Sequence, residues 1–429
     1  MARNTLRSRR LASALIGGCL LLNTAFGFAA PYELTLEESI RLALANNPAI
    51  KIAETEQEKA GWAVKEAQAG KAPTLNLGHT SSRGQFDTLS DDISNNFKNS
   101  VTLSLPLYTG GKVESAIEQA KLSRDVSILG VEDSKQQIRL NATTAYYSVL
   151  QSANMVKLSQ ESVDRLQAHV QNVQAQYEVG TVAKTDVLRS EVEVADAEQS
   201  LIKAENSYEL AVASLNNVLG LPLDTQVDVK DQLAYTQVAL TLDDAITQAM
   251  VTRPDLAQAE IAVAIAGEGV DGARAGYRPT VGLSAAQGWS DDDFPGTDND
   301  KWSVGVTASW NIFDSGLTRS QVRQSQSTLE KSRQQQQQAK DAAQLEVRQA
   351  YLNLKEAEKR IATSQVAVNK AEEDYKIAQV RYTSGVGTNL DVIDSQVALT
   401  QAKTNYVQSL YDYNTSRAKL EKAIGASVQ

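Results

Sequence analysis

The feature that most limits how this chain can fold is an internal repeat that covers almost its whole length. The segment LTLEESI at Leu34 returns as LTLDDAI at Leu240, a shift of 206 residues. Further along, Tyr382 repeats Tyr177 at a shift of 205, each time in a Tyr-x-x-Gly setting. Self-similarity at a fixed spacing indicates a repeat architecture, so both copies should contain the same order of helices and strands.

Each copy contains a pair of strands, predicted by alternation of apolar and polar residues. The alternation is clearest from Val101 to Leu107 in the first copy and from Trp302 to Ile312 in the second, and it is weaker just before each segment. A period of two residues is typical of strands with one apolar face. The predicted strand pairs are about residues 73–108 and about residues 279–313.

Two long segments without proline follow the strand pairs and predict helical hairpins. The chain has eight prolines in 429 residues, and none lies between Leu107 and Leu221 or after Pro295. Proline breaks helices, so these segments should be mostly helical. The stretch from Lys112 to Glu178 contains one glycine and, at about 1.5 Å per residue, would form a rod about 100 Å long. The predicted hairpins are about residues 112–219 and about residues 317–424.

The first residues are predicted to be a secretory signal peptide, residues 1–29. Four arginines precede an apolar run from Leu11 to Leu22, and small residues follow it. Cleavage would remove Cys19, the only cysteine, and would leave 38 basic against 52 acidic residues. The alternative is a lipoprotein signal in which Cys19 is acylated.

The rest of the chain divides into repeat 1 at 30–225, a linker at 226–239 and repeat 2 at 240–429.

Composition excludes several classes of protein. A formal net charge of −10 argues against a nucleic-acid partner, because such partners require basic surfaces. Two histidines and one cysteine are too few for a zinc or iron–sulfur site, and His79 and His169 each lack a second such ligand nearby. Residue spacing supports no catalytic serine, histidine and aspartate set. The sequence therefore predicts no metal, no cofactor and no enzyme activity.

The predicted strands have the features of membrane-spanning β-strands. They are about ten residues long and apolar on one side. Aromatic residues near their ends suit an interfacial girdle, and these are Tyr108, Trp289, Trp302, Trp310 and Phe313. The alternative is a half-buried soluble sheet, which shows the same alternation. Four strands cannot close a barrel, whereas three chains would supply twelve strands around an aqueous lumen.

A combination of motifs resembles one known family. The tandem repeat, the TLEESI segment at Thr35, the Pro-Thr pair before each strand pair, the YTGG segment at Tyr108 and the Tyr-x-x-Gly turn followed by Asp-Val resemble the TolC family of outer-membrane efflux proteins. The resemblance covers essentially the whole mature chain. It implies a mainly α fold with a membrane β part, in which a homotrimer forms a twelve-stranded β-barrel continued by a long α-helical barrel.

The resemblance also implies a location, a function and partners. It places the β part in lipid of the cell outer membrane and the helical barrel in the periplasm. The chain would be the exit duct of a tripartite efflux pump or a type I secretion system. Its partners would be a periplasmic adaptor and an inner-membrane pump of the ABC or RND type. The alternatives are a periplasmic adaptor and a structural coiled-coil protein of the cell envelope.

A periplasmic gate is implied at the far end of the hairpins. By resemblance, its residues are Tyr382, Asp391, Asp394, Thr185 and Asp186, and the family's arginine position is occupied here by Gly387. Asp391 and Asp394 are three residues apart on one helix face, so a threefold axis would gather six carboxylates into a cation-attracting ring. The alternative is that Asp391 only caps the helix.

The two turns of the hairpins are the expected docking points for an adaptor. They would be the most distal and exposed parts of the rod, as connecting turns usually are. The residues assigned to docking by resemblance and geometry are Val179, Gly180, Thr181, Gly385, Val386 and Gly387.

Overall fold

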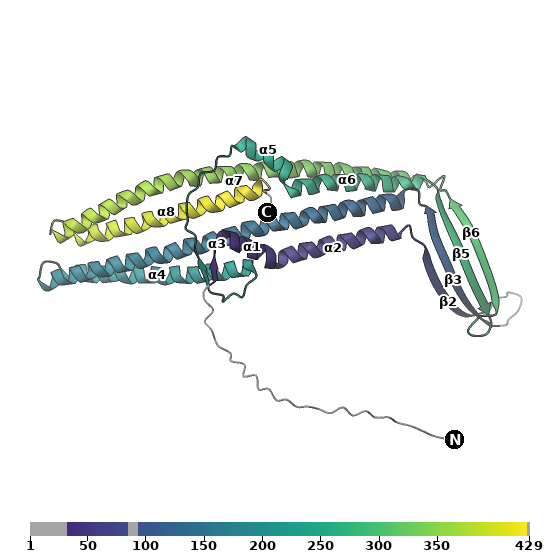
Figure 1. The fold of residues 1–429 in the computed structure, drawn as a ribbon, viewed down its shortest axis with the longest axis horizontal. Coiled ribbons are helices and arrows are strands. Elements are labelled where there is room, and N and C mark those ends of the chain that lie inside the picture. Colours follow the sequence, from purple (N-terminus) through teal and green to yellow (C-terminus); the bar gives the residue numbers. More distant parts are fainter. Residues whose placement is uncertain (1–31, 85–92, 427–429) are drawn as a thin grey trace, which may run out of the picture.

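The computed structural model describes residues 32–84 and 93–426 of the chain. The predicted signal peptide, residues 1–29 with Cys19, lies outside the described residues. The molecule is elongated (Figure 1): a β-sheet forms one end, the turns of two helical hairpins form the other, and short helices pack around the middle.

The two repeats have the same order of elements. In the first copy these are α1 (Leu36–Asn46), α2 (Pro48–Ala69), β2 (Thr74–Gly84), β3 (Ser94–Tyr108), α3 (Lys112–Glu178) and α4 (Lys184–Leu219). In the second they are α5 (Leu242–Thr252), α6 (Pro254–Arg274), the short 3₁₀ helix η1 (Ala275–Tyr277), β5 (Thr280–Asp291), β6 (Asn299–Ser309), α7 (Leu317–Thr383) and α8 (Asn389–Ala423). The short strands β1 (Tyr32–Leu34) and β4 (Val227–Val229) pair in parallel.

Side-chain caps fix where the short helices begin. Thr35 and Glu38 form a capping box at the start of α1, in which the Thr35 hydroxyl accepts from the Glu38 amide at 3.3 Å. Thr241 accepts from the Asp244 amide at the start of α5. α2 and α6 begin with proline at the first helical position, where no amide hydrogen is needed.

One antiparallel sheet unites the strand pairs of both repeats. Its order is β2-β3-β5-β6, so the pairing of β3 with β5 joins the two copies directly. The outer strands β2 and β6 each have one edge that no strand of the described chain covers. Since neighbouring strands alternate in direction, β2 and β6 run antiparallel to each other at the two edges.

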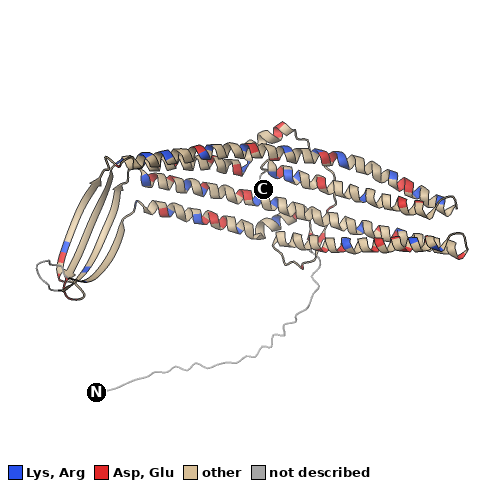
Figure 2. Cartoon of the chain, turned by 180° about the vertical axis from the view of Figure 1, so that it is seen from behind, with Lys and Arg blue, Asp and Glu red and all other residues tan. Residues whose placement is uncertain are grey.

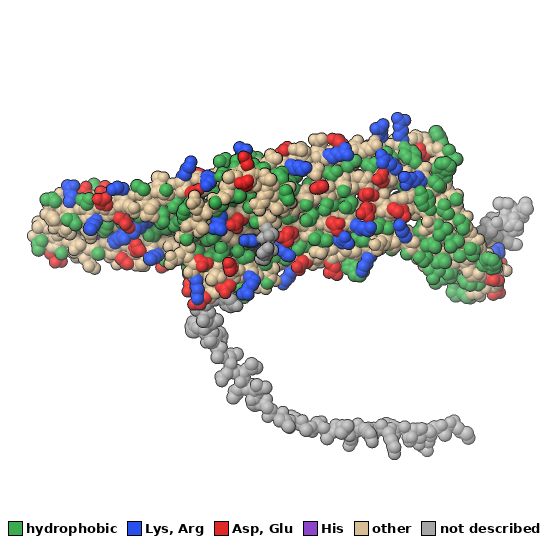
Figure 3. All heavy atoms as spheres, turned by 45° about the horizontal axis from the view of Figure 1, so that its top comes forward, with side chains coloured by type: hydrophobic (Ala, Val, Ile, Leu, Met, Phe, Trp, Pro, Cys, Tyr) green, Lys and Arg blue, Asp and Glu red, His purple; other side chains and the backbone are tan. Residues whose placement is uncertain are grey.

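The two faces of the sheet differ in polarity. One row across the strands contains Leu75, Leu103, Ala285 and Val304. The adjacent row, which points to the other face, contains Asn76, Thr102, Ala286 and Ser303. Leu77 is 81% and Val304 63% exposed, so the described residues leave much of the apolar face uncovered. Figure 3 shows hydrophobic side chains gathered over the sheet, and Figure 2 shows that charges on it lie toward the end far from the helices.

The hairpins pack side by side around the middle of the molecule. α3 packs against α4 and α8, and α7 packs against α8. One core surrounds Tyr146, whose hydroxyl donates to Asp231 Oδ2 at 2.7 Å, and a second surrounds Tyr413.

None of the helices within the described ranges has a stretch long and apolar enough to cross a bilayer.

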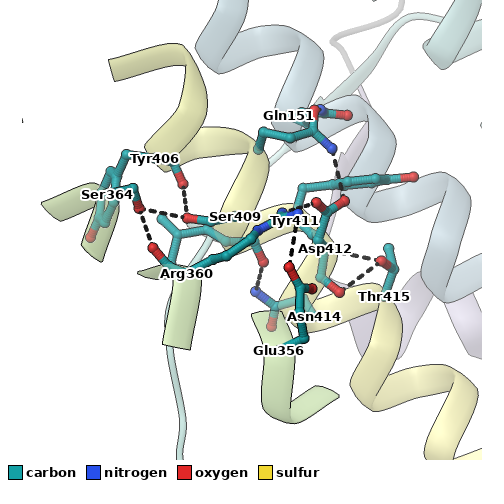
Figure 4. Close-up of polar contacts among 12 residues, drawn as sticks. Gln151, Glu356, Arg360, Ser364, Tyr406, Ser409, Tyr411, Asp412, Asn414 and Thr415 are labelled. Carbon is teal, nitrogen blue, oxygen red and sulfur yellow. Dashed lines mark hydrogen bonds and ion pairs between the residues drawn. The ribbon is translucent and has the colours of Figure 1, made fainter. Parts of the chain in front are cut away.

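Polar contacts between helices supplement these cores near the middle of the molecule (Figure 4). Arg360 of α7 forms an ion pair with Asp412 of α8. Ser364 and Ser409 hydroxyls lie 3.0 Å apart between the same helices. Gln151 of α3 donates to Gln408 of α8, so this region also connects the first hairpin with the second.

Candidate gate at the tips of the helical hairpins

Each hairpin ends in a tight turn of similar geometry. We call Tyr177–Ser190 tip 1 and Tyr382–Ser395 tip 2, two segments that correspond at a shift of 205. Gly180 and Gly385 adopt φ of +78° and +75°, a left-handed conformation that glycine adopts without strain. The tips lie at the end of the molecule opposite the sheet (Figure 1).

The turn of tip 2 leaves little room for a side chain at position 387. The Gly387 amide donates to the Arg381 carbonyl at 3.1 Å. A Cβ at this position would lie 3.0 Å from the Tyr382 nitrogen and 3.1 Å from the Arg381 carbonyl carbon. A side chain at Gly387 would require the neighbouring backbone to shift by a few tenths of an ångström, whereas tip 1 has Val182 at the corresponding position. The arginine half of the implied gate has no counterpart at position 387.

Asp391 is the third residue of helix α8 and forms a capping box with the N-cap residue Thr388. Its Oδ2 accepts from the Thr388 amide at 3.0 Å, and its own amide donates to the Thr388 hydroxyl at 3.2 Å. The backbone hydrogen bond from Thr388 lowers the pKa of Asp391, and the Thr388 side chain and the charge of Arg381 add to this effect. The capping role considered from the sequence is thus present, although the Asp391 side chain remains exposed to solvent.

Asp391 and Asp394 line the same exposed groove. It has a volume of about 480 Å³, and Asp374 and Arg381 of α7 line its other side. Three carboxylates against one guanidinium give the groove a negative balance. The arrangement can attract cations, and the carboxylates of α8 remain accessible to a neighbouring chain.

Tyr382 is buried between the hairpins, in contact with an apolar cluster. The cluster consists of Val173, Val187, Ala378, Tyr382 and Val392. Burial raises the pKa of Tyr382, and the charge of Asp186 raises it further. The hydroxyl is buried without a hydrogen-bond partner among the described residues, so it bonds to neither Asp186 nor Thr185 there. Thr185 itself is exposed, and Asp186 is half-buried.

Three buried polar residues that were not assigned to the gate from the sequence connect the hairpins. His169 of α3, Ser190 of α4 and Asn389 of α8 are 6%, 1% and 5% exposed. The Asn389 amide nitrogen donates to the Asp186 carbonyl at 3.1 Å, and its Oδ1 lies 2.6 Å from His169 Nε2. Ser190 Oγ lies 3.2 Å from the same Oδ1. We call His169, Ser190 and Asn389 the tip latch.

A weak signal for the tip latch existed in the sequence. Each member lies about one helical turn from an apolar residue of the tip cluster: His169 from Val173, Ser190 from Val187 and Asn389 from Val392. Continuing the apolar stripe by three or four positions therefore places these polar residues in the core. The contact between His169 and Asn389 joins residues 220 positions apart, so the spacing of residues along the chain gave no sign of it.

The assigned docking turns are exposed. Val179 and Val386 are large apolar side chains with most of their surface in solvent. In tip 1, the Thr181 hydroxyl donates to the Gln176 carbonyl at 2.8 Å, which ties the turn to α3. The role of the two turns in docking stays a prediction.

The aromatic residues assigned to the girdle lie near both ends of the sheet. Trp289 and Trp302 are near its outer end, while Tyr108 ends β3 next to the helices. Trp310 and Phe313 lie just beyond β6. This strand ends at Ser309 and does not continue through the predicted alternation to Ile312. Trp310 Nε1 donates to the Tyr277 carbonyl at 3.0 Å. At about 3.3 Å per residue, Trp302 and Trp310 are about 26 Å apart along the strand.

The chain matches the sequence model of the outer membrane efflux protein family over residues 39–221 and 245–426, one match in each repeat. It is 23% identical to the outer membrane protein TolC of Escherichia coli over 395 residues, which cover 89% of this chain and 80% of TolC. It is 26% identical to the alkaline protease secretion protein AprF of Pseudomonas aeruginosa, with 96% and 88% of the two chains covered.

A solved structure has the same fold. The outer membrane protein VceC of Vibrio cholerae superposes with a TM-score of 0.78 at 18% identity, and the alignment covers 92% of this chain and 97% of VceC. At this identity the likeness concerns the fold: long helices, a β part and a tandem repeat.

The chain belongs to the outer membrane efflux protein family, which includes TolC. This confirms the predicted family, the mainly α fold with a membrane β part, and the role of an outer-membrane efflux channel located in the outer membrane and extending into the periplasm. The two alternatives drawn from the sequence, a periplasmic adaptor and a structural coiled-coil protein, are therefore rejected.

Proposed function

We propose that three copies of this chain close into one tube that serves as the exit duct of an efflux or secretion system. The observation that carries the proposal is the open sheet with two uncovered edges, β2 and β6. An open edge in a bilayer leaves backbone groups without hydrogen bonds, at a cost of several kcal/mol each. Because β2 and β6 run in opposite directions, β6 of one chain can pair antiparallel with β2 of the next.

In the closed barrel the two faces of the sheet would have different environments. The apolar face, with Leu77 and Val304, would contact lipid, and the polar face, with Asn76 and Ser303, would line the lumen. The two aromatic groups at the ends of the sheet would then lie at the two membrane interfaces, since outer-membrane strands carry an apolar band of about 25 Å between aromatic girdles. The helical hairpins would continue the tube into the periplasm.

The far end of this tube would hold the gate. In a trimer, Asp391 and Asp394 of three chains would meet near one axis and form a ring of carboxylates, while Tyr382 packs each second hairpin against the first. The exposed turns at Val179–Thr181 and Gly385–Gly387 would contact a periplasmic adaptor that links the duct to an inner-membrane pump. AprF is named for secretion of a protease, so secreted polypeptides are one cargo class to test for this duct. The proposal includes no catalytic step.

Cysteine cross-linking across the two edges tests closure. Asn76→Cys on β2 is combined in turn with Ser303→Cys, Gly305→Cys and Thr307→Cys on β6, all on the polar face. We expect one combination to give a disulfide-linked trimer on a non-reducing gel. The matched control replaces Asn76→Cys with Thr102→Cys on β3, which β2 and β5 cover on both sides.

The same preparation is tested in a planar bilayer. A closed trimer should conduct, and its current should respond to cations added on the side of the tips. A monomeric product that forms no cross-link in any combination and carries no current would contradict the proposed assembly.

A further inference from the structure

Burial favours the neutral form of His169 in the tip latch, because the side chain is 6% exposed. Asn389 Oδ1 accepts a hydrogen bond, so Nε2 of His169 carries a hydrogen, as it does both in one neutral tautomer and in the imidazolium. Protonation of Nδ1 therefore keeps this hydrogen bond and acts by adding a buried charge. A second proton on Nδ1 would place a cation beside the Tyr382 ring, whose centre lies 5.1 Å from that of His169. Isolated charges in apolar surroundings are costly, and histidine titrates near neutral pH.

The groups around His169 offer little compensation for such a charge. The titratable groups that face it are Tyr382 from α7 and Asp186 from α4, which presents its backbone carbonyl to the latch. α8 contributes the neutral Asn389, while Asp391 is on the other side of that helix in the exposed groove. Arg165 lies one turn away on α3. Burial lowers the pKa of His169, the hydrogen bond to Asn389 raises it, and no charged side chain of the described residues contributes.

We propose that the tip latch holds the second hairpin against the first in a closed gate, and that protonation of His169 releases it. The inference rests on the proposed gate and adds its regulation. The hydrogen-bonded connection between the hairpins at this level runs through Asn389, since the Tyr382 hydroxyl has no partner among the described residues.

The direction of the pH effect follows from the burial. His169 is harder to protonate in the closed latch than in an opened tip, where water reaches it. The closed latch therefore has its full stability above the ordinary histidine pKa of 6.5 and loses it as the pH falls from there through the lower value of the buried group. Acidification on the side of the tips should favour the open state.

Thiol labelling tests the latch without relying on current. Val392→Cys places a buried thiol in the tip cluster, and Thr383→Cys places an exposed thiol nearby as a control for the pH dependence of labelling. The mature chain is expected to have no other cysteine. The labelling ratio is the labelling rate of the Val392→Cys thiol divided by that of the Thr383→Cys thiol. This ratio should rise several-fold when the pH is lowered from about 7.5 to about 5.5.

His169→Gln is the decisive variant, because glutamine retains a donor near the Nε2 position and does not titrate. With His169→Gln the labelling ratio should stay low at both pH values. His169→Ala should raise it at both. An unchanged pH response in His169→Gln would overturn the proposal, as would a labelling ratio that does not depend on pH in the parent chain.

Single-channel recording connects the latch to the gate. An Asp391→Asn, Asp394→Asn background removes the two acidic side chains that α8 contributes to the groove. In this background, conductance should rise as the tip side is acidified, and the rise should vanish with His169→Gln. A conducting trimer without this pH response would overturn the latch and leave the proposed duct intact. A protein that never conducts would overturn the duct and, with it, the role of the latch in a gate.

Discussion

The two hairpin tips share a sequence pattern and a backbone turn but differ in what they bury. Tyr177 and Lys184 of tip 1 are exposed, whereas their counterparts Tyr382 and Asn389 of tip 2 are buried against the first hairpin. Each turn has a left-handed glycine at the corresponding position. A repeated sequence thus reproduces the backbone, while different side chains at corresponding positions, such as Lys184 and Asn389, decide which residues are buried between the hairpins.

The helix starts at the two tips differ in the same way. Thr388 and Asp391 form a capping box at tip 2. At tip 1 the corresponding residues are Ala183 and Asp186, and Ala183 has no side-chain oxygen to accept a hydrogen bond. The first turn of α8 is therefore fixed locally as well as by the latch, whereas the first turn of α4 depends on packing.

The largest difference between the tips should follow from Asn389→Leu. The change leaves His169 Nε2 without its partner, whereas Ser190 keeps its hydrogen bond to the Asp186 carbonyl, and a buried polar group without a partner costs about 1–3 kcal/mol. We expect faster hydrogen exchange in the first turns of α8 and a higher conductance at neutral pH. Lys184→Leu, the same change at the exposed position of tip 1, should alter neither. Equal effects at both tips would refute the asymmetry.

The carboxylates of tip 2 should control cation block. Asp391→Asn with Asp394→Asn removes the acidic side chains of α8 from the groove, and we expect block by divalent cations to weaken several-fold. Asp186→Asn at tip 1 is the matched control, because its half-buried side chain lies outside this groove. Current recordings with divalent cations added on the tip side measure both. If Asp186→Asn weakened the block by divalent cations more than the double variant does, the cation site would lie at tip 1.

Exchanging the caps should change stability in opposite directions. Thr388→Ala removes an N-cap and should destabilise the start of α8 by about 1 kcal/mol. Ala183→Thr, at a residue with nearly the same backbone angles, should form a capping box with Asp186 and stabilise the start of α4 by a smaller amount. Hydrogen exchange of the two first turns measures both effects, and a loss of protection in Ala183→Thr would argue against the equivalence of the turns.

The capping box of tip 2 should also depend on pH. The pKa of Asp391 is lowered in the folded protein by its hydrogen bonds with Thr388. The contribution of the cap is therefore complete above the ordinary value of 3.8 and is lost as the pH falls through the lower folded value. Protection of the α8 amides should follow this course, and Thr388→Ala should flatten it. A pH course that is the same in Thr388→Ala would assign the effect to another group.

The smallest effect is expected from Tyr382→Phe. Its hydroxyl has no hydrogen-bond partner among the described residues, so phenylalanine retains the packing of the ring and loses no bond within the chain. Stability and conductance should remain close to those of the parent, as for Tyr177→Phe at tip 1. A large rise in conductance would show that the hydroxyl bonds to a neighbouring chain in the assembled tube.

Local structure could be predicted from the sequence more completely than the contacts at the gate. The capping boxes, the proline positions and the long helix from Lys112 to Glu178 follow from nearest neighbours along the chain. The early end of β6 at Ser309 did not follow from the alternation, since it depends on the partner strand β5, which begins at Thr280 opposite Ser309. The sequence placed Tyr382 in the gate but did not indicate that its hydroxyl lacks a partner.

By itself the sequence determined the repeat, the order of helices and strands, and the family. Periodicity, capping and turn chemistry are local properties, so each copy carries them independently. Only the tertiary structure decided that β3 pairs with β5 to join the copies and that His169, Ser190 and Asn389 meet between the hairpins. These contacts join residues about 200 positions apart, and they depend on how two long helical hairpins pack, which no local pattern specifies.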